Sequence, residues 1–219
     1  MSKEKEIGKK EAARDKKYFN FWRKWFQFFV SHVLFMIRFK LVYRLEVIGK
    51  ENIPKDSNYI IASNHMSTLD PPLMGAILDK PIAYMSKKEL FANPFMRWWL
   101  NWLGAFAVDR EKLSVSTIKT AITISKTDWV LGIFPQGTRE PAGKITKFSR
   151  GFTAIAKASK CGILPVGFIG TDEAKWIPFS GKIVVKIGKL IPYSDNVDGM
   201  ADKWLEDIQQ LTGFEYTGK

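Results

Sequence analysis

The residues best suited to chemistry are His65 and Asp70, in the stretch SNHMSTLD (63–70). A carboxylate that accepts a hydrogen bond from one imidazole nitrogen fixes the tautomer and leaves the other nitrogen free to take a proton. Such a pair could act as a general base on a hydroxyl group. On a continuous helix, positions five apart are rotated by about 140°, so these side chains would not meet there. The pair therefore requires a loop that folds His65 back onto Asp70.

The surrounding sequence favours such a loop. The apolar run 59–63 predicts a strand before His65, and Pro71 suits the first position of a helix that Asp70 would cap. In an α/β sheet, ligands bind at the carboxyl ends of strands, where this loop would lie. The spacing alone is common, and the alternative is a surface-loop histidine beside an aspartate that only caps a helix.

The stretch FPQGTRE (134–140) supports the chemical interpretation, because it too follows a predicted strand. Pro135 and Gly137 predict a turn, and Arg139 would project from it. The planar guanidinium of arginine suits phosphate. Taken alone, the stretch is better explained as a glycine turn with an exposed arginine.

The stretch MSKKELF (85–91) follows another predicted strand and places Lys87 and Lys88 at a helix start. Lysine charge and free backbone N–H groups can bind an anion together there. A solvated lysine pair is the ordinary explanation of this stretch by itself. Three such stretches, each after a strand, make coincidence a less attractive explanation.

The elements that must position these residues follow from the pattern after residue 45, where short β-branched runs alternate with helix-period segments. Predicted strands are 45–49, 59–63, 82–86, 105–109, 129–134, 163–169 and 182–188, and predicted helices are 71–79, 89–102, 113–126, 150–160 and 200–211. This alternation predicts an α/β layered fold with a mostly parallel sheet flanked by helices.

Length and charge limit the number of domains and the kinds of partner that the sequence favours. The 219 residues suit one domain, and 34 Lys+Arg against 22 Asp+Glu give a formal charge of +12. Such an excess favours nucleic acid, an acidic membrane or a phosphorylated substrate. Nucleic acid is not expected, because the aromatic residues gather in apolar runs rather than along a basic stripe. The single cysteine, Cys161, excludes an internal disulfide, and one cysteine with two histidines makes a structural zinc site improbable.

The N-terminal region predicts a membrane contact. Residues 1–17 indicate a charged, solvated arm, and residues 18–44 an amphipathic helical segment ahead of the domain at 45–219. The least polar part, 25–37, is about half of the ~20 residues that a spanning helix needs, and basic residues flank it. This favours a segment lying in the headgroup region, with a core helix or a full span as alternatives. The aromatic stretch 93–104 could contact the bilayer, line an acyl-chain tunnel or form a core helix.

Four stretches in order resemble the sequence blocks of the glycerolipid acyltransferase family, in particular bacterial 1-acyl-glycerol-3-phosphate acyltransferases. They are NHMSTLD (64–70), GAFAVDR (104–110), FPQGTR (134–139) and GILPVGF (162–168). The resemblance covers roughly residues 45 to 190 and is specific as an ordered set. It implies the α/β layered fold, and an N-terminal segment that dips into one leaflet, as in some bacterial members.

The resemblance also implies roles for individual residues. His65 and Asp70 match the catalytic dyad, and Pro165 matches a proline on the acyl-donor side. The positions that match acceptor and phosphate binding are Lys87, Arg110, Gln136, Gly137, Thr138 and Arg139. One position departs from the pattern, because the third block commonly has glutamate where this chain has Gln136. Glutamine keeps two-sided hydrogen bonding without the charge, which leaves the acceptor's identity open.

The activity that the resemblance implies is transfer of a fatty acyl group to the sn-2 hydroxyl of 1-acyl-glycerol-3-phosphate, giving phosphatidic acid. The donor would be an acyl-coenzyme A or an acyl carrier protein thioester, without a metal, and the Gly137 turn could supply N–H groups to the oxyanion. The enzyme would be a peripheral or monotopic protein on the cytoplasmic side of a membrane with anionic lipid. Glycerol-3-phosphate or another lysophospholipid is an alternative acceptor, and a non-catalytic lipid-binding module is the alternative from another class.

Overall fold

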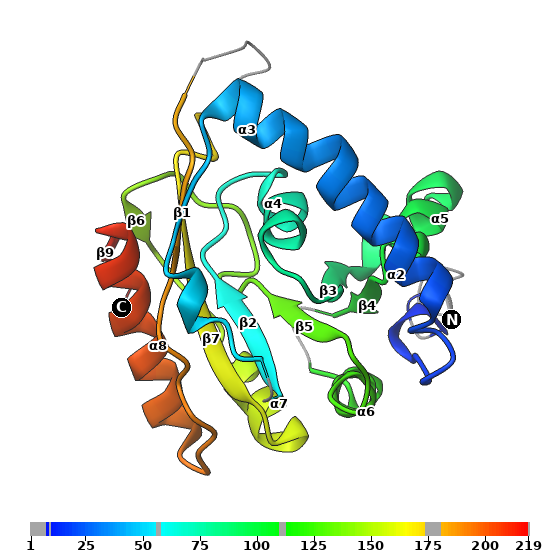
Figure 1. The fold of residues 1–219 in the computed structure, drawn as a ribbon. Coiled ribbons are helices and arrows are strands. Elements are labelled where there is room, and N and C mark those ends of the chain that lie inside the picture. Colours follow the sequence, from blue (N-terminus) through cyan, green and yellow to red (C-terminus); the bar gives the residue numbers. More distant parts are fainter. Residues whose placement is uncertain (1–7, 9, 56–57, 110–112, 174–180, 219) are drawn as a thin grey trace.

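The computed structural model describes residues 8, 10–55, 58–109, 113–173 and 181–218 (Figure 1). Its centre is a seven-stranded sheet with the order β1-β8-β7-β2-β5-β3-β4. The strands are β1 (Glu46–Ile48), β2 (Tyr59–Ser63), β3 (Ile82–Lys87), β4 (Phe106–Val108), β5 (Val130–Ile133), β7 (Gly162–Ile169) and β8 (Val184–Ile187). All neighbours in this sheet are parallel except β7 and β8. The mostly parallel sheet is therefore confirmed, and each predicted strand is present to within two residues.

Helices flank the sheet as predicted. They are α4 (Asp70–Ile77), α5 (Pro94–Trp102), α6 (Val115–Ile124), α7 (Gly151–Ser159) and α8 (Val197–Thr212), with short turns η2 (Lys50–Asn52) and η3 (Lys88–Phe91). The single helix expected over 89–102 is wrong, because Asn93 caps a new helix through the N–H of Met96 and Pro94 starts it. The short parallel pair β6 (Lys144–Ile145) and β9 (Glu215–Tyr216) was not predicted.

One long N-terminal helix crosses the domain above α4 (Figure 1). It consists of α2 (Phe21–Phe28), a wider π-helical segment η1 (Phe29–Met36) and α3 (Ile37–Tyr43). Two glycines allow the close packing of this helix, α4 and the sheet. A Cβ on Gly75 of α4 would lie 2.7 Å from the Ser31 hydroxyl, and one on Gly132 of β5 would lie 3.3 Å from the Met74 sulfur. The helix 21–43 thus packs on α4, which packs on the sheet.

The other side of the helix 21–43 carries an apolar stripe that faces solvent. Its exposed large hydrophobic residues are Phe21, Trp22, Trp25, Phe28, Phe29, Val33, Leu34, Ile37 and Leu41. Six of them recur every four residues from Phe21 to Leu41, and each such step advances about 40° around an α-helix. Because the i→i+5 turns of η1 take more residues per turn, they reduce this drift and keep the stripe on one side.

A buried amide fastens the helix 21–43 to the sheet. Gln27 Nε2 donates to the carbonyl oxygens of Ile82 and Leu103, both at 2.7 Å, and its Oε1 accepts from the Ile82 N–H at 2.7 Å. Gln27 therefore satisfies both polar groups of the residue that begins β3. A buried polar side chain is favourable here because all of its bonding capacity toward the backbone is used.

Residues 10–17 correct the expectation of a solvated arm. Glu11 and Ala12 are buried, and the Arg14 N–H donates to the Thr120 hydroxyl of α6 at 3.0 Å. The Arg14 guanidinium also bonds Glu11 and Asn101. The charges pair with one another and with the domain, which is why this part of the arm packs despite its polar composition.

We predict that Gln27→Ala weakens the attachment of the helix 21–43. The change leaves one buried N–H and two carbonyl groups without their partner, at a cost of about 1–3 kcal/mol for each unsatisfied group before local relaxation. We expect the free energy of unfolding to fall by about 2–3 kcal/mol in detergent, measured by chemical denaturation. The control Gln210→Ala makes the same change at an exposed position of α8 and should alter stability by less than about 0.5 kcal/mol. Equal losses in the two variants would contradict the anchor.

Candidate active site

The structure brings His65 and Asp70 together at the carboxyl end of β2. His65 Nδ1 lies 2.7 Å from Asp70 Oδ2, with the Asp70 side chain fully buried and the His65 side chain 14% exposed. His65 is in the loop between β2 and α4, and Asp70 is the first residue of α4. The loop geometry that the sequence required is therefore present.

The carboxylate of Asp70 does not cap α4, in contrast to the expectation. The helix begins at Asp70 itself, and the capping position belongs to Leu69, which makes no side-chain bond. Asp70 Oδ2 instead accepts from the Met66 and Ser67 N–H groups, both at 2.7 Å, as well as from His65. The tight turn through 66–68 points these N–H groups back at the Asp70 carboxylate. The carboxylate therefore stabilises the loop before α4 rather than the first turn of the helix.

These bonds define the chemical state of the imidazole. An ionised carboxylate only accepts hydrogen bonds, so the proton shared with Asp70 lies on His65 Nδ1. His65 Nε2 then carries a lone pair and can take a proton from a substrate.

Hydrogen bonds to β7 and β3 fix the two ends of the His65 loop. Asn64 exchanges two hydrogen bonds with the Phe168 backbone of β7, at 2.9 and 2.7 Å, so it continues the pairing of β2 beyond its last residue. At the other end, the Tyr84 hydroxyl donates to the Pro71 carbonyl at 2.7 Å. Burial raises the pKa of Tyr84, which keeps the hydroxyl protonated as a donor.

The loop after β5 contacts both the ring and the backbone of His65. The Phe134 ring stacks on the imidazole, with centroids 4.2 Å apart and an interplanar angle of 26°. The His65 N–H donates to Gln136 Oε1 at 2.6 Å, and the Glu140 N–H donates to the His65 carbonyl at 2.9 Å. The stretch 134–140 therefore lies against His65.

This loop also presents the expected phosphate ligands. Gly137 has a φ of 69°, a left-handed conformation that favours glycine, and it turns the chain so that Thr138 and Arg139 are exposed. Within the described part of the chain, Arg139 makes no hydrogen bond or ion pair, so its guanidinium is available to an anion there. The Gly137 N–H donates to the Phe134 carbonyl at 2.9 Å, so it could serve an oxyanion only by breaking the turn.

The cationic candidates around the end of β3 are Lys87 and Lys88. Lys87 is the last residue of β3 and is exposed, 3.9 Å from the Glu89 carboxylate, while Lys88 forms an ion pair with Asp109. Arg110 lies outside the described residues. The phosphate roles expected of Lys87 and Arg110 stay predictions.

Two candidates are buried in the protein. Pro165 lies inside β7, paired in register with Ala62 of β2, so any effect on the donor would be indirect. Gln136 is 5% exposed, and its amide bonds His65 on one side and Glu140 on the other. A contact between Gln136 and the acceptor stays a prediction, and it would require the amide to release one of these bonds.

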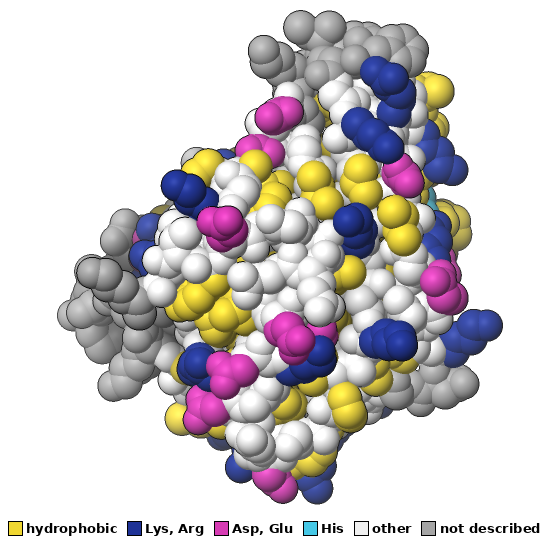
Figure 2. Space-filling model, turned by 90° about the vertical axis from the view of Figure 1, so that its left-hand side faces the viewer, with side chains coloured by type: hydrophobic (Ala, Val, Ile, Leu, Met, Phe, Trp, Pro, Cys, Tyr) yellow, Lys and Arg dark blue, Asp and Glu magenta, His cyan; other side chains and the backbone are white. Residues whose placement is uncertain are grey.

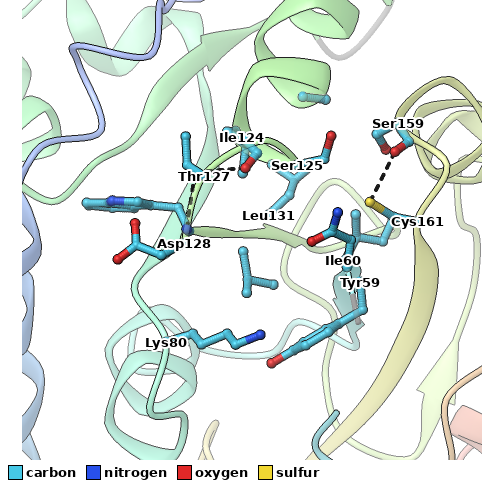
Figure 3. A pocket seen from close by; sticks show the side chains of 14 residues that line it. Tyr59, Ile60, Lys80, Ile124, Ser125, Thr127, Asp128, Leu131, Ser159 and Cys161 are labelled. Atoms are coloured by element: carbon cyan, nitrogen blue, oxygen red, sulfur yellow. Dashed lines mark hydrogen bonds between the residues drawn. The ribbon is translucent and has the colours of Figure 1, made fainter. Parts of the chain in front are cut away.

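Two hollows lie away from the dyad. One hollow, of about 30 Å³, lies at the amino ends of β2, β5 and β7. Its lining includes Tyr59, Lys80 and Cys161 (Figure 3). It has room for about one water molecule and lies a strand's length from the dyad. The other hollow, of about 320 Å³, lies between α2 and the final residues of α4, lined by Trp25 and His32 among others. Asp70 begins α4, so neither hollow belongs to the dyad.

Comparison with known proteins agrees with this geometry. The family model described as "Acyltransferase" matches residues 44–169, which include the dyad and the 134–140 loop. The chain belongs to this acyltransferase family. Relatives of this acyltransferase include the 1-acyl-sn-glycerol-3-phosphate acyltransferase of Bacillus subtilis, 37% identical over 69% of this chain and 75% of the relative. The enzyme of the same name from Streptococcus pneumoniae is 35% identical over 76% of this chain but only 62% of its own length.

The fold is also similar to a solved structure. The crystal structure of the 1-acyl-sn-glycerophosphate (LPA) acyltransferase PlsC from Thermotoga maritima matches with a TM-score of 0.59 and 28% identity. The match covers 76% of this chain and 72% of the other. It supports the acyltransferase fold.

The sequence analysis did not identify two residues that the site depends on, Asn64 and Glu140. Both are buried polar side chains, and both stand inside stretches that were recognised. The available signal was weak: an asparagine directly before the histidine, and a carboxylate four residues after Gln136. Their roles depend on distant partners, the Phe168 backbone and the His65 loop.

We predict that removing either member of the dyad abolishes most acyl transfer. His65→Ala removes the base and should lower kcat by about 10²–10⁴-fold, and Asp70→Asn should also lower it because the amide no longer fixes the proton on Nδ1. The rate of acyl transfer at saturating acceptor is the measurement. His32→Ala, which changes the chain's other histidine on the N-terminal helix, is the matched control and should retain the wild-type kcat. A His65→Ala enzyme as fast as wild type would rule out the base.

Proposed function

We propose that this acyltransferase moves a fatty acyl group from a thioester to the sn-2 hydroxyl of 1-acyl-glycerol-3-phosphate, giving phosphatidic acid. The observation that carries the proposal is the His65–Asp70 pair beside a loop that exposes Arg139, and among the described residues His65 Nε2 has no hydrogen-bond partner. The names of the relatives support the same acceptor. The donor class is an acyl-coenzyme A or acyl carrier protein thioester.

In the proposed reaction, His65 Nε2 takes the proton of the acceptor hydroxyl as its oxygen attacks the thioester carbonyl. Asp70 stabilises the imidazolium that forms, through the 2.7 Å bond to Nδ1. The tetrahedral intermediate then expels the thiolate as the C–S bond breaks, and the proton passes from His65 to sulfur. One ester forms and one thioester is lost, so no oxidant or further reactant is required.

The acceptor phosphate supplies the binding energy that positions the hydroxyl. Arg139 is the proposed ligand best supported by the structure, because Glu140, the next residue, donates its N–H to His65 O. Consecutive Cα atoms are about 3.8 Å apart. The Arg139 Cα therefore lies about that distance from the Cα of Glu140, the residue that bonds the His65 backbone. Lys87 and Arg110 are the further phosphate ligands that we propose, together with Thr138 and the Gly137 turn.

The apolar stripe of the helix 21–43 is the proposed membrane contact. This helix has 23 residues, its most apolar 18-residue window has a mean hydropathy of 1.3, and 22% of that window is buried, so by length and composition it could cross a bilayer. Since its inner side is fastened through Gln27 to β3, we favour an interfacial position with only the stripe in lipid. Leu90 of η3 and Phe95 and Trp98 of α5 extend the exposed apolar surface, and ring contacts of Phe26 with Trp98 and Trp99 join α5 to α2.

The opposite end of the domain has a different surface. Figure 2 shows the face near α8, where Lys and Arg alternate with Asp and Glu among scattered apolar groups. Ion pairs between Arg150 and Asp202 and between Lys203 and Asp207 belong to this region. Figure 1 shows β2 and β5 directed toward the side of the domain that the helix 21–43 crosses, which is where the loop that carries His65 begins. An acceptor held in the membrane would thus reach the base from the stripe's side.

Transfer of a labelled acyl group tests the proposed function. Purified protein is given acyl-coenzyme A or acyl carrier protein thioester, with 1-acyl-glycerol-3-phosphate, glycerol-3-phosphate or a neutral lysophospholipid as the acceptor. We expect phosphatidic acid as the main product. Preferred acylation of glycerol-3-phosphate or of the neutral acceptor would overturn the proposed substrate, and no transfer with any pair would overturn the reaction.

We predict that Arg139→Ala weakens binding of the phosphorylated acceptor. Loss of a charge-assisted contact should raise the KM for 1-acyl-glycerol-3-phosphate about 10- to 100-fold, with a smaller effect on kcat. Steady-state kinetics at fixed donor concentration measure both. Lys126→Ala removes the same charge from an exposed site at the amino end of the sheet and is the control. An unchanged KM in Arg139→Ala would contradict the phosphate role.

We also predict that charges on the apolar stripe release the enzyme from membranes. Trp25→Glu with Phe29→Glu should greatly reduce sedimentation with vesicles of anionic phospholipid, because both side chains are exposed on the stripe. Val115→Glu places a charge on an exposed apolar residue of α6 and should still sediment. Point changes are preferable to deleting residues 1–44, because that deletion also removes the buried Gln27, Phe39 and Tyr43. Full sedimentation of the Trp25/Phe29 variant would refute the contact.

A further inference from the structure

The amide of Gln136 and the carboxylate of Glu140 form a buried pair next to the catalytic histidine. Gln136 Nε2 donates to Glu140 Oε2 at 2.7 Å, and the two residues are only 5% and 6% exposed. Glu140 Oε2 also accepts from the Thr146 N–H at 2.8 Å, and Oε1 accepts from the Thr146 hydroxyl. The buried carboxylate therefore receives three hydrogen bonds and no cationic partner among the described residues.

The pair controls both backbone polar groups of His65. Gln136 Oε1 accepts from the His65 N–H at 2.6 Å, and the Glu140 N–H donates to the His65 carbonyl at 2.9 Å. The imidazole depends on this backbone for its direction toward Asp70 and toward the acceptor. A shift of about 1 Å at a catalytic group can cost on the order of 100-fold in rate.

Only an amide at position 136 satisfies this arrangement. Its oxygen must accept from His65 while its nitrogen donates to Glu140, and a carboxylate has no N–H to donate. A glutamate at 136 would place two carboxylate oxygens about 2.7 Å apart in a buried site. One of them would have to take up a proton, or the side chains would separate and release the His65 N–H.

We propose that Gln136 and Glu140 act as one positioning pair for His65, in which the amide at position 136 joins the His65 N–H to the buried carboxylate at position 140. The proposal rests on the proposed function for its kinetic consequences. It assigns Gln136 to the orientation of the base rather than to recognition of the acceptor.

A double-mutant cycle tests the pair. Gln136→Glu alone should lower kcat at least about tenfold with little change in the KM for 1-acyl-glycerol-3-phosphate, because the base is displaced while the phosphate ligands remain. Glu140→Gln alone should be mild, since two amides can still bond each other. In the double variant the carboxylate and the amide exchange places, so kcat should return to within about threefold of Glu140→Gln. Melting temperatures of all four proteins accompany the kinetics.

The pattern of outcomes decides between the roles. A Gln136→Glu enzyme with wild-type kcat would overturn the proposal, as would equal losses from Gln136→Glu with and without Glu140→Gln. A raised KM at unchanged kcat would return Gln136 to acceptor recognition. If Gln136→Glu does not fold, the double variant still must fold and transfer acyl groups, and its failure to do so would also reject the pair.

A second measurement separates this inference from the proposed substrate. The chain has only two histidines, so ¹⁵N-histidine labelling gives a spectrum in which His65 is assigned by comparison with the His32→Ala protein. Gln136→Glu should speed hydrogen exchange of the His65 amide at least about tenfold, and the double variant should slow it again. This result does not depend on any acceptor or donor. An unchanged exchange rate would overturn the positioning role even if the enzyme acylates the expected lipid.

Discussion

The buried carboxylate of Asp70 is the interaction on which the site depends. It is a charge without solvent contact, and one of its oxygens gathers the imidazole and two backbone N–H groups. Burial of such a charge is costly unless hydrogen bonds compensate it. The 65–70 loop supplies three bonds to Oδ2, while Oδ1 has no hydrogen-bond partner among the described residues, so one carboxylate oxygen shapes the loop that carries His65.

The surrounding fold serves to hold that loop at both ends and from the side. Asn64 bonds the start of the loop to β7, and Tyr84 bonds the first turn of α4 to β3. The loop after β5 bonds the His65 backbone through Gln136. Each restraint comes from a different strand of the parallel sheet. Because the carboxyl ends of parallel strands meet at one edge, residues distant in sequence can converge there. The exposed Arg139 belongs to the same loop as Gln136 and Glu140, which bond the His65 backbone. This loop therefore joins the proposed anion site to the proposed base.

The N-terminal helix is the proposed link between this chemistry and a lipid surface. Its inner side is specific, with the Gln27 amide and the Ser31–Gly75 contact, while its outer side offers only apolar and aromatic area. The apolar residues of this helix recur every four positions, and the π-helical turns keep them on one side as a straight exposed stripe. A helix fixed to β3 and to α4 would hold the whole domain at a constant height above the bilayer, within reach of an acceptor that stays in the membrane.

The sequence by itself determined the strand–helix alternation, the mostly parallel sheet, the family and the identity of the dyad. These depend on local periodicity, on Pro and Gly positions, and on short motifs, each of which involves residues close together in the sequence. Only the tertiary structure decided that Asp70 bonds the loop instead of capping α4, that Arg14 folds the charged arm onto α6, and that Gln136 shares its amide between His65 and Glu140. Those outcomes depend on which distant polar groups become buried together, because a buried donor or acceptor takes whichever partner the packing brings within reach.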